Sequence, residues 1–346
     1  MTDRKLRKHN LRPHYLASVC LLVLLVGCAS PMTPDEPEPT ESATMPADAA
    51  SPLPVWTPAW TATHIPSSSH TTTPAPTFTA TPDPIVRFAV IGDFGDVGDA
   101  ARDVANLVDS WNPEFVITTG DNNYPAGEAS TIDANIGQYY HEYIHPYTGS
   151  YGEGAEINRF FPVLGNHDWI TDGAQAYFDY FTLPGNERYY DVVWEHVHLF
   201  ALDNLTQEPD GVGMSSRQAA WLRERLAASA SPWKIVYMHA PPYSSGLHGS
   251  IDWARWPYRE WGATAVLSGH DHTYERILVD GFPYFVNGLG GGAIYYFETV
   301  VEGSQVRFNG DYGAMLVEAS PDFITFQFVT RAGLVIDSYT IDQTPG

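Results

Sequence analysis

An apolar run passes directly into a glycine-flanked aspartate in Val86-Arg87-Phe88-Ala89-Val90-Ile91-Gly92-Asp93-Phe94-Gly95. The run has the length of a buried strand. Four more short apolar runs lead into polar motifs, in the order Gly120-Asp121-Asn122-Asn123-Tyr124, Gly165-Asn166-His167-Asp168, Val236-Tyr237-Met238-His239 and Gly269-His270-Asp271-His272. Each of the five motifs holds a side chain that binds metals. The pattern predicts a two-metal site made from strand ends, and two metals about 3.5 Å apart suit in-line displacement at phosphorus.

Apolar runs of strand length alternate with amphipathic stretches from Ile85 onward. A helical spacing of apolar residues lies between the first two runs, and Ser215-Ser216-Arg217-Gln218 resembles a capping box that opens a helix through about Ala230. Alternation of strands and helices indicates an α/β layered fold. The predicted strands, apolar on both faces, are Val86–Ile91, Phe115–Thr118, Phe160–Leu164, His198–Leu202, Ile235–Met238 and Ala265–Leu267.

The C-terminal third is rich in strand signals and has little helix between them. The run Gly288-Leu289-Gly290-Gly291-Gly292 lacks the Lys-Ser/Thr ending of a phosphate-binding loop, so we interpret it as a tight turn. The predicted strands are Tyr284–Val286, Ala314–Glu318, Phe323–Val329 and Val335–Ile341.

The N-terminal segment has the layout of an export signal. Basic residues precede a short apolar run from Leu16 to Val26, which is too short for a typical membrane-spanning helix. The run ends in Leu25-Val26-Gly27-Cys28, which resembles the lipobox of bacterial lipoproteins. That resemblance implies cleavage after residue 27 and lipidation of Cys28. The protein is then exported and tethered by lipid to the outer face of a bacterial membrane, at the cell surface or in the periplasm. A cleaved signal with a chance cysteine is the alternative.

Three segments follow from these patterns: a lipoprotein signal peptide at 1–27, a tether at 28–84, and a catalytic domain at 85–346. The tether is rich in Pro, Thr and Ser, and such a composition cannot bury enough apolar surface to offset its ordering entropy. The formal net charge of −23 argues against binding of a nucleic-acid backbone, which relies on Lys and Arg.

The ordered set of motifs resembles the calcineurin-like metallophosphoesterase superfamily, and within it the purple acid phosphatases. Two details favour that branch: Asp93-Phe94-Gly95 replaces the Asp-x-His of most members, and Tyr124 stands where most have Asp. The run Gly269-His270-Asp271-His272-Thr273-Tyr274-Glu275-Arg276 also looks like the last motif of the branch. The resemblance implies a four-layer αββα sandwich of two mixed β-sheets flanked by helices.

Carried over residue by residue, the resemblance implies a binuclear site. Asp93, Tyr124 and His272 bind the first metal, and Asp121 bridges both metals. The second metal is bound by Asn166, His239 and His270. Hard anionic donors suit Fe(3+) at the Tyr124 position, whereas neutral donors suit Zn(2+), Mn(2+) or Fe(2+) at the other. Tyrosinate on ferric iron absorbs visible light, so a coloured protein is expected.

The resemblance also assigns a catalytic role to His167, which binds phosphate or protonates the leaving oxygen. His248 lies on a loop after the His239 strand and is a second candidate for that work. Asp168 orients a neighbouring histidine or caps a turn. The implied chemistry is hydrolysis of phosphate monoesters by a metal-bound hydroxide that attacks phosphorus. Two alternatives remain open: a phosphodiesterase or nucleotidase on the same site, and a non-catalytic binding protein on the cell surface.

Overall fold

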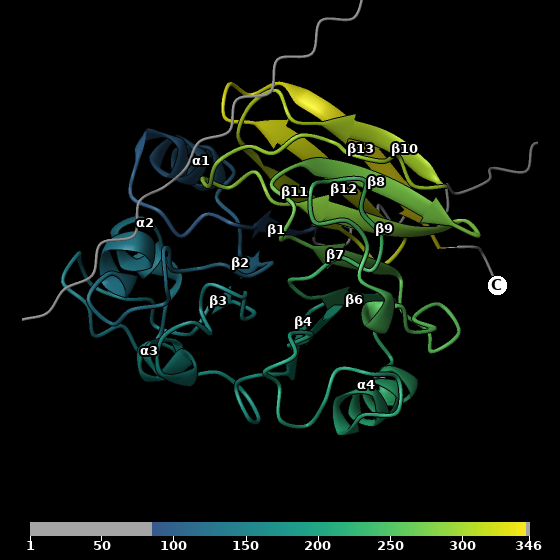
Figure 1. Ribbon diagram of the computed structural model, residues 1–346, viewed down its shortest axis with the longest axis horizontal. Helices are drawn as coiled ribbons and strands as arrows, with labels where there is room; N and C mark the ends of the chain where they lie inside the picture. The colour runs from purple at the N-terminus through teal and green to yellow at the C-terminus, as the bar shows by residue number, and fades with distance from the viewer. Residues whose placement is uncertain (1–84, 344–346) are drawn as a thin grey trace, which may run out of the picture. The chain divides into compact units, whose positions relative to one another are not determined.

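The computed structural model describes residues 85–343. The predicted signal peptide and tether lie outside these residues. Within residues 85–343 the strands form two mixed sheets (Figure 1). Sheet A has the order β13-β12-β11-β1-β2-β3 and sheet B the order β10-β8-β9-β7-β6-β5-β4. None of the helices in the described part of the chain combines the length and the apolar character needed to cross a bilayer.

The strands of sheet A are β1 (Val86–Ile91), β2 (Phe115–Thr118), β3 (Phe160–Phe161), β11 (Gly313–Ala319), β12 (Phe323–Thr330) and β13 (Val335–Asp342). Those of sheet B are β4 (Tyr190–Trp194), β5 (Val197–Ala201), β6 (Trp233–Tyr237), β7 (Ala265–Ser268), β8 (Tyr274–Val279), β9 (Phe282–Asn287) and β10 (Ser304–Phe308). The helices are α1 (Asp99–Ser110), α2 (Gln138–Tyr140), α3 (Gln175–Tyr180) and α4 (Arg217–Ala228).

Alternation along the central strands of sheet B shows how the layers stack. In β6, Ile235 and Tyr237 belong to the core shared with sheet A, whereas Val236 faces the core beneath α4. The same alternation holds in β7, where Leu267 faces sheet A and Val266 faces α4. Successive side chains of a strand point to opposite faces, so sheet B lies between sheet A and α4. With α1 packed against sheet A, the predicted α/β sandwich of two mixed sheets flanked by helices is confirmed.

Several predicted elements need correction. The predicted strand Phe160–Leu164 pairs only over Phe160–Phe161, and the next residues already form the loop that carries the Asn166 motif. The cap of α4 is Ser216 alone, whose side chain accepts a hydrogen bond from the Ala219 N–H. Gln218 is not part of a capping box, because its side chain donates to the Asp203 carbonyl and accepts from the Asp203 N–H. The strands β4, β8 and β10 were not predicted.

The loop Gly288–Gly292 is a close packing element, consistent with the predicted turn. The N–H of Gly290 donates to the Gly92 carbonyl, and the N–H of Gly292 donates to the Asp93 carbonyl. A Cβ on Gly290 would lie 2.5 Å from the Gly92 oxygen, which leaves no room for a side chain. The loop therefore supports the Asp93 turn through its backbone.

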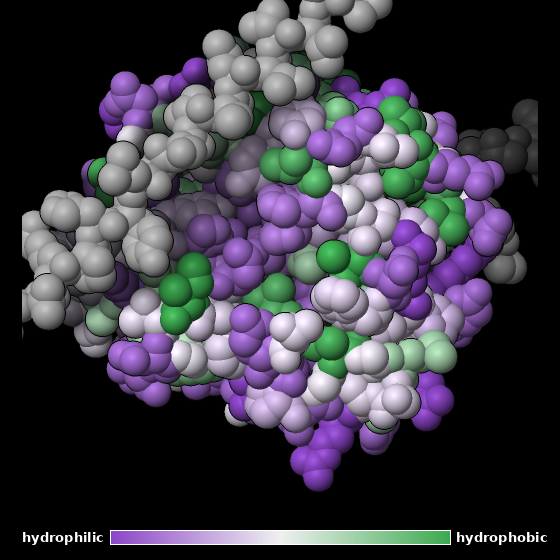
Figure 2. Space-filling view, in the orientation of Figure 1, coloured by the Kyte–Doolittle hydropathy of each residue, from purple (hydrophilic) through white to green (hydrophobic). Residues whose placement is uncertain are grey.

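Hydrophobic residues on the face in view are scattered among hydrophilic ones and do not gather in one large patch (Figure 2). Scattered apolar residues of this kind are normal on the surface of a soluble domain. This face therefore carries no large apolar docking surface.

Candidate metal centre

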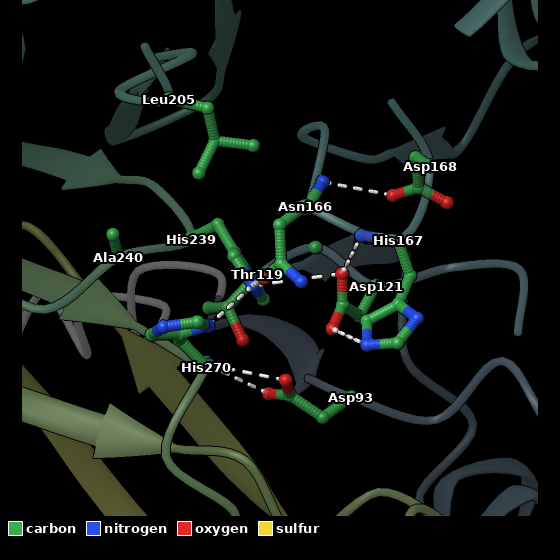
Figure 3. A network of polar contacts seen from close by, with 12 residues as sticks. Asp93, Thr119, Asp121, Asn166, His167, Asp168, Leu205, His239, Ala240 and His270 are labelled. Atoms are coloured by element: carbon green, nitrogen blue, oxygen red, sulfur yellow. Dashed lines mark hydrogen bonds and ion pairs between the residues drawn. The ribbon is translucent and has the colours of Figure 1, made fainter. Parts of the chain in front are cut away.

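The five motifs meet at one edge of the two sheets. Strands β1, β2 and β3 run parallel in sheet A, and β6 and β7 run parallel in sheet B. Parallel strands bring their carboxyl ends to the same edge, which is where α/β folds place ligands. Figure 3 shows the result, with Asn166 between Asp121 and His239.

One group of side chains surrounds the first position. Ligand atoms of Asp93, Asp121 and His272 all lie within 4.8 Å of one another. The Tyr124 hydroxyl lies 3.0 Å from His272 Nε2 and 3.0 Å from Asp121 Oδ2. Two carboxylates, a phenol and an imidazole therefore converge, which is a donor set that suits a hard, highly charged cation.

A second group adjoins the first. His239 Nε2 lies 2.9 Å from Asn166 Oδ1 and 3.1 Å from His270 Nδ1. The other carboxylate oxygen of Asp121, Oδ1, lies 3.5 Å from His239 Nε2. The two oxygens of Asp121 therefore face two different groups of donors.

Backbone carbonyls fix which nitrogen of each histidine faces the centre. The Nδ1 of His239 lies 2.8 Å from the Thr119 carbonyl, which can only accept, so this nitrogen carries the proton. The Nε2 of the same ring is then the nitrogen that faces Asn166 Oδ1. His272 repeats the arrangement, with Nδ1 donating to the Ala293 carbonyl at 2.6 Å and Nε2 aimed at Tyr124. A backbone carbonyl that fixes the tautomer of a histidine is typical of metal ligands.

Three residues of the motifs have a strained backbone. Asp93, Asp121 and His270 have φ values of 54°, 52° and 70°. Non-glycine residues rarely adopt this left-handed region, and such strain tends to cluster at functional sites. A Cβ on Gly165 would lie 2.1 Å from the backbone nitrogen of Asp121, so the β2 and β3 loops touch backbone to backbone. These contacts aim the side chains inward.

Burial sets the protonation of the groups. Burial raises the pKa of Tyr124 well above its ordinary value, so the phenol is neutral unless a cation stabilises its anion. Burial and the charge of His239 lower the pKa of His270 to about 3, which keeps that imidazole neutral. Burial alone would raise the pKa of the Asp121 carboxyl, but the charges of His239 and His167 hold it below its usual range. Metals bind the neutral imidazole and the ionised carboxylate, which are the forms that His270 and Asp121 favour.

His167 faces the centre from the side of Tyr124. Its Nδ1 donates to the Pro125 carbonyl at 2.6 Å, which leaves Nε2 4.0 Å from Asp121 Oδ2. Its ring packs edge-on against Tyr124, with centroids 4.5 Å apart. About a third of the side chain is exposed, so Nε2 can reach a substrate oxygen.

His248 approaches from the opposite loop. Its ring stacks on His270, with centroids 4.2 Å apart. Its Nδ1 lies 3.2 Å from Asp271 Oδ1, and this hydrogen bond raises the pKa of His248 against the opposing effect of burial. A protonated His248 beside the centre is a candidate proton donor.

The structure decides between the two roles considered for Asp168. Its carboxylate accepts from the N–H groups of Asn122 and Gly165 and from the Asn122 side chain. It therefore joins the β2 and β3 loops as a turn cap and orients no histidine. Arg276 is also away from the centre, since it pairs with Asp337 on β13.

Tyr295 is the neighbour that the sequence did not reveal. Its ring stacks on His272 with centroids 4.0 Å apart and meets the His248 ring at 5.4 Å. It belongs to the irregular segment between β9 and β10, and no motif surrounds it. Only its place in the fold brings it over the centre.

Comparisons with known proteins identify the family of the chain. Residues 86–274 match the calcineurin-like phosphoesterase family. The chain is 24% identical over 311 residues to mouse tartrate-resistant acid phosphatase type 5, covering 76% of this chain and 92% of the relative. It is 29% identical over 288 residues to purple acid phosphatase 3 of Arabidopsis thaliana, covering 73% of this chain and 77% of the relative.

Solved structures share the fold. Purple acid phosphatase PPD1 from yellow lupin superposes with a TM-score of 0.63 at 17% identity, over 76% of this chain and 55% of the lupin chain. The protein thus spans about half the length of that enzyme. GAP50, described as the anchor in the inner membrane complex of Plasmodium, superposes with a TM-score of 0.58 at 18% identity, over 75% of this chain and 90% of GAP50. With more than half of its residues matched, the chain belongs to the calcineurin-like phosphoesterase family and is a phosphoester hydrolase with purple acid phosphatases among its relatives.

Proposed function

We propose that the protein hydrolyses phosphate monoesters at a binuclear metal centre. The proposal rests on the orientation of Asp121, because its two carboxylate oxygens face separate groups of donors. Asp93, Tyr124 and His272 complete the first group. Asn166, His239 and His270 complete the second. A carboxylate that faces both ways is the geometry expected of a bridge between two cations.

The side chains around the two proposed metal positions differ in charge. The first combines the carboxylate of Asp93 with the phenol of Tyr124, and we assign it Fe(3+) because hard anionic donors favour a trivalent ion. The second combines an amide oxygen with two imidazoles, which suits Zn(2+), Mn(2+) or Fe(2+). The net charge of −23 makes such neutralisation by metals important, because phosphate esters are anions.

Bound cations would neutralise the phosphate and lower the pKa of the water that attacks phosphorus. The chain's own residues do the rest. His167, with Nδ1 committed to the Pro125 carbonyl, presents Nε2 to a phosphate oxygen. His248, with Nδ1 bound to Asp271, presents its other nitrogen to the leaving oxygen and gives it a proton.

The monoester assignment is supported by relatives that are named acid phosphatases. The test compares initial rates on p-nitrophenyl phosphate and bis(p-nitrophenyl) phosphate, with the metal-loaded protein and after removal of metals by a chelator. We expect faster turnover of the monoester, lost with the metals. Faster turnover of the diester would favour the phosphodiesterase alternative, and metal content without turnover of either would favour a binding protein.

We further propose that the protein is exported and held at the outer face of a bacterial membrane by a lipid on Cys28. The support is the basic, then apolar, then Leu-Val-Gly-Cys order of the N-terminal residues. A tether at residues 28–84 would hold the catalytic domain away from the lipid surface.

A further inference from the structure

Two surface segments frame a recess beside the centre. One is the loop Ser244–Ser250, which carries His248, and the other is the irregular segment between β9 and β10, which carries Tyr295. Between them lies a cavity of about 260 Å³ whose walls include Leu247, His248, Ser250, Glu298, Thr299 and Val301. It is separate from the group of metal ligands, but His248 belongs to its wall.

His248 links this recess to the reacting centre. One face of its ring stacks on His270, a proposed metal ligand, and the same side chain lines the recess. The recess therefore begins one imidazole ring away from a proposed metal ligand, on the side of the centre where His248 lies. The remainder of an alcohol bound there would extend along Ser250 and Thr299.

Buried hydrogen bonds hold both walls in place. Glu275 of β8 is fully buried, and its carboxylate accepts from the Ser245 N–H at 2.7 Å and from Ser245 Oγ at 2.6 Å. The segment between β9 and β10 is also bound to Ser245. The Val301 N–H donates to Ser245 Oγ at 3.0 Å, and the Glu298 N–H donates to the Ser245 carbonyl at 2.9 Å. Ser245 thus joins both walls to β8, and the recess is a built part of the fold.

The walls indicate the chemistry of the occupant. Hydroxyl groups, a carboxylate and short apolar side chains are present, and no lysine or arginine is among the described residues that line the recess. Glu298 would repel a second phosphate, and so would the net charge of −23. A cavity of about 260 Å³ is also below the roughly 300–1,000 Å³ of sites for drug-sized ligands.

We propose that this recess receives the leaving alcohol and selects phosphate monoesters of small, uncharged polyhydroxy alcohols, such as hexose phosphates. The inference rests on the proposed function and names the substrate class of the same site. Hydroxyl groups of the alcohol bind Ser250, Glu298 and Thr299, whereas leaving groups that carry further phosphates are excluded.

The first test fills the recess. Thr299→Trp places a large ring in its wall, whereas Val300→Trp changes the next residue, which is exposed and does not line the recess. The measured quantity is the ratio of kcat/KM for glucose 6-phosphate to kcat/KM for ethyl phosphate. We expect a ratio above one in the wild type, a fall of about tenfold in Thr299→Trp, and little change in Val300→Trp.

The second test reverses one charge. Glu298→Lys should raise kcat/KM for fructose 1,6-bisphosphate relative to glucose 6-phosphate by about tenfold, because the lysine attracts the second phosphate. Glu302→Lys is the matched control, since Glu302 lines a different recess. The substrate assignment would be overturned if Thr299→Trp and Val300→Trp gave the same kcat/KM ratio and Glu298→Lys and Glu302→Lys also gave the same ratio. A wild type with a higher kcat/KM for ethyl phosphate than for glucose 6-phosphate would overturn it as well. A wild type inert toward p-nitrophenyl phosphate would instead refute the proposed function.

Discussion

His239 Nε2 lies 2.9 Å from Asn166 Oδ1, and the Nδ1 of the same imidazole donates to the Thr119 carbonyl. An imidazole nitrogen and an amide oxygen, both of which bind metals, therefore lie side by side. With Nδ1 donating to Thr119, Nε2 is the nitrogen of His239 that is free to bind a cation. The pair lies next to Asp121, whose second carboxylate oxygen contacts the Tyr124 hydroxyl.

Tyr124→Phe should abolish visible absorption of the iron-loaded protein, because only a phenolate on ferric iron gives such a band. The ring still packs against His167 in the variant, so the fold should be unchanged. Absorption spectra of the purified proteins measure the effect. Tyr295→Phe is the control, since that phenol stacks on His272 and is outside the proposed ligand set. A band that survives Tyr124→Phe would contradict the assignment of the first metal.

Asp121→Ala should lower the occupancy of both metal positions, because each loses one carboxylate oxygen. We expect hydrolysis of p-nitrophenyl phosphate to fall by at least about 100-fold. Elemental analysis counts the metals per chain. Asp168→Asn, which changes a turn cap beside the centre, is a useful comparison. Full occupancy of both positions in Asp121→Ala would refute the bridge.

Asp203 should make stability depend on pH. Burial raises the pKa of its carboxyl well above the ordinary value, and it accepts from the Leu205 N–H and the Trp169 side chain. The folded state then holds a proton that the unfolded state has lost, so the free energy of unfolding falls as pH rises from about 4 through the folded pKa.

Asp203→Asn removes this titration and should flatten that part of the profile. The difference between wild type and variant should change by roughly 1.4 kcal/mol per pH unit within the window. Urea unfolding at a series of pH values measures it. Parallel profiles for the two proteins would show that Asp203 does not titrate as its burial implies.

Cys28→Ser should release the protein from the membrane if Cys28 carries the lipid. Incorporation of a labelled fatty acid by cells that express the full chain provides the readout. We expect label in the wild type and none in the variant, whereas Cys20→Ser, which changes the other cysteine, should not abolish the label. Equal labelling of wild type and Cys28→Ser would remove the basis for the tether.

The sequence predicted the parts of the fold in which local pattern and tertiary role agree. The strands β1 and β2 begin and end at the predicted residues, because both are buried on both faces and read as continuous apolar runs. The strand β10 was missed because its burial alternates between intermediate and exposed positions at a sheet edge, which gives little apolar signal. The Asn166 loop begins earlier than predicted, since Pro162–Leu164 is buried without strand pairing.

The residues of the candidate site also divide into those with a local sequence pattern and those without one. Residues inside motifs, such as Asp121 and His239, could be proposed from the sequence because they lie within three residues of a strand end. Tyr295 and Ser245 were missed because their importance comes from contacts with β8 and His272, which are distant from them in the sequence. Packing between segments of this kind has no local signature.

The central claim is tested most directly by Asn166→Ala beside the wild type and an Asn106→Ala control on the exposed face of α1. Metal content and hydrolysis of p-nitrophenyl phosphate are measured on the same purified samples. A binuclear centre predicts two metals and turnover in wild type and control. In Asn166→Ala we expect the loss of one metal and a fall in activity of at least about 100-fold. An Asn166→Ala protein that keeps both metals and full activity would contradict this claim.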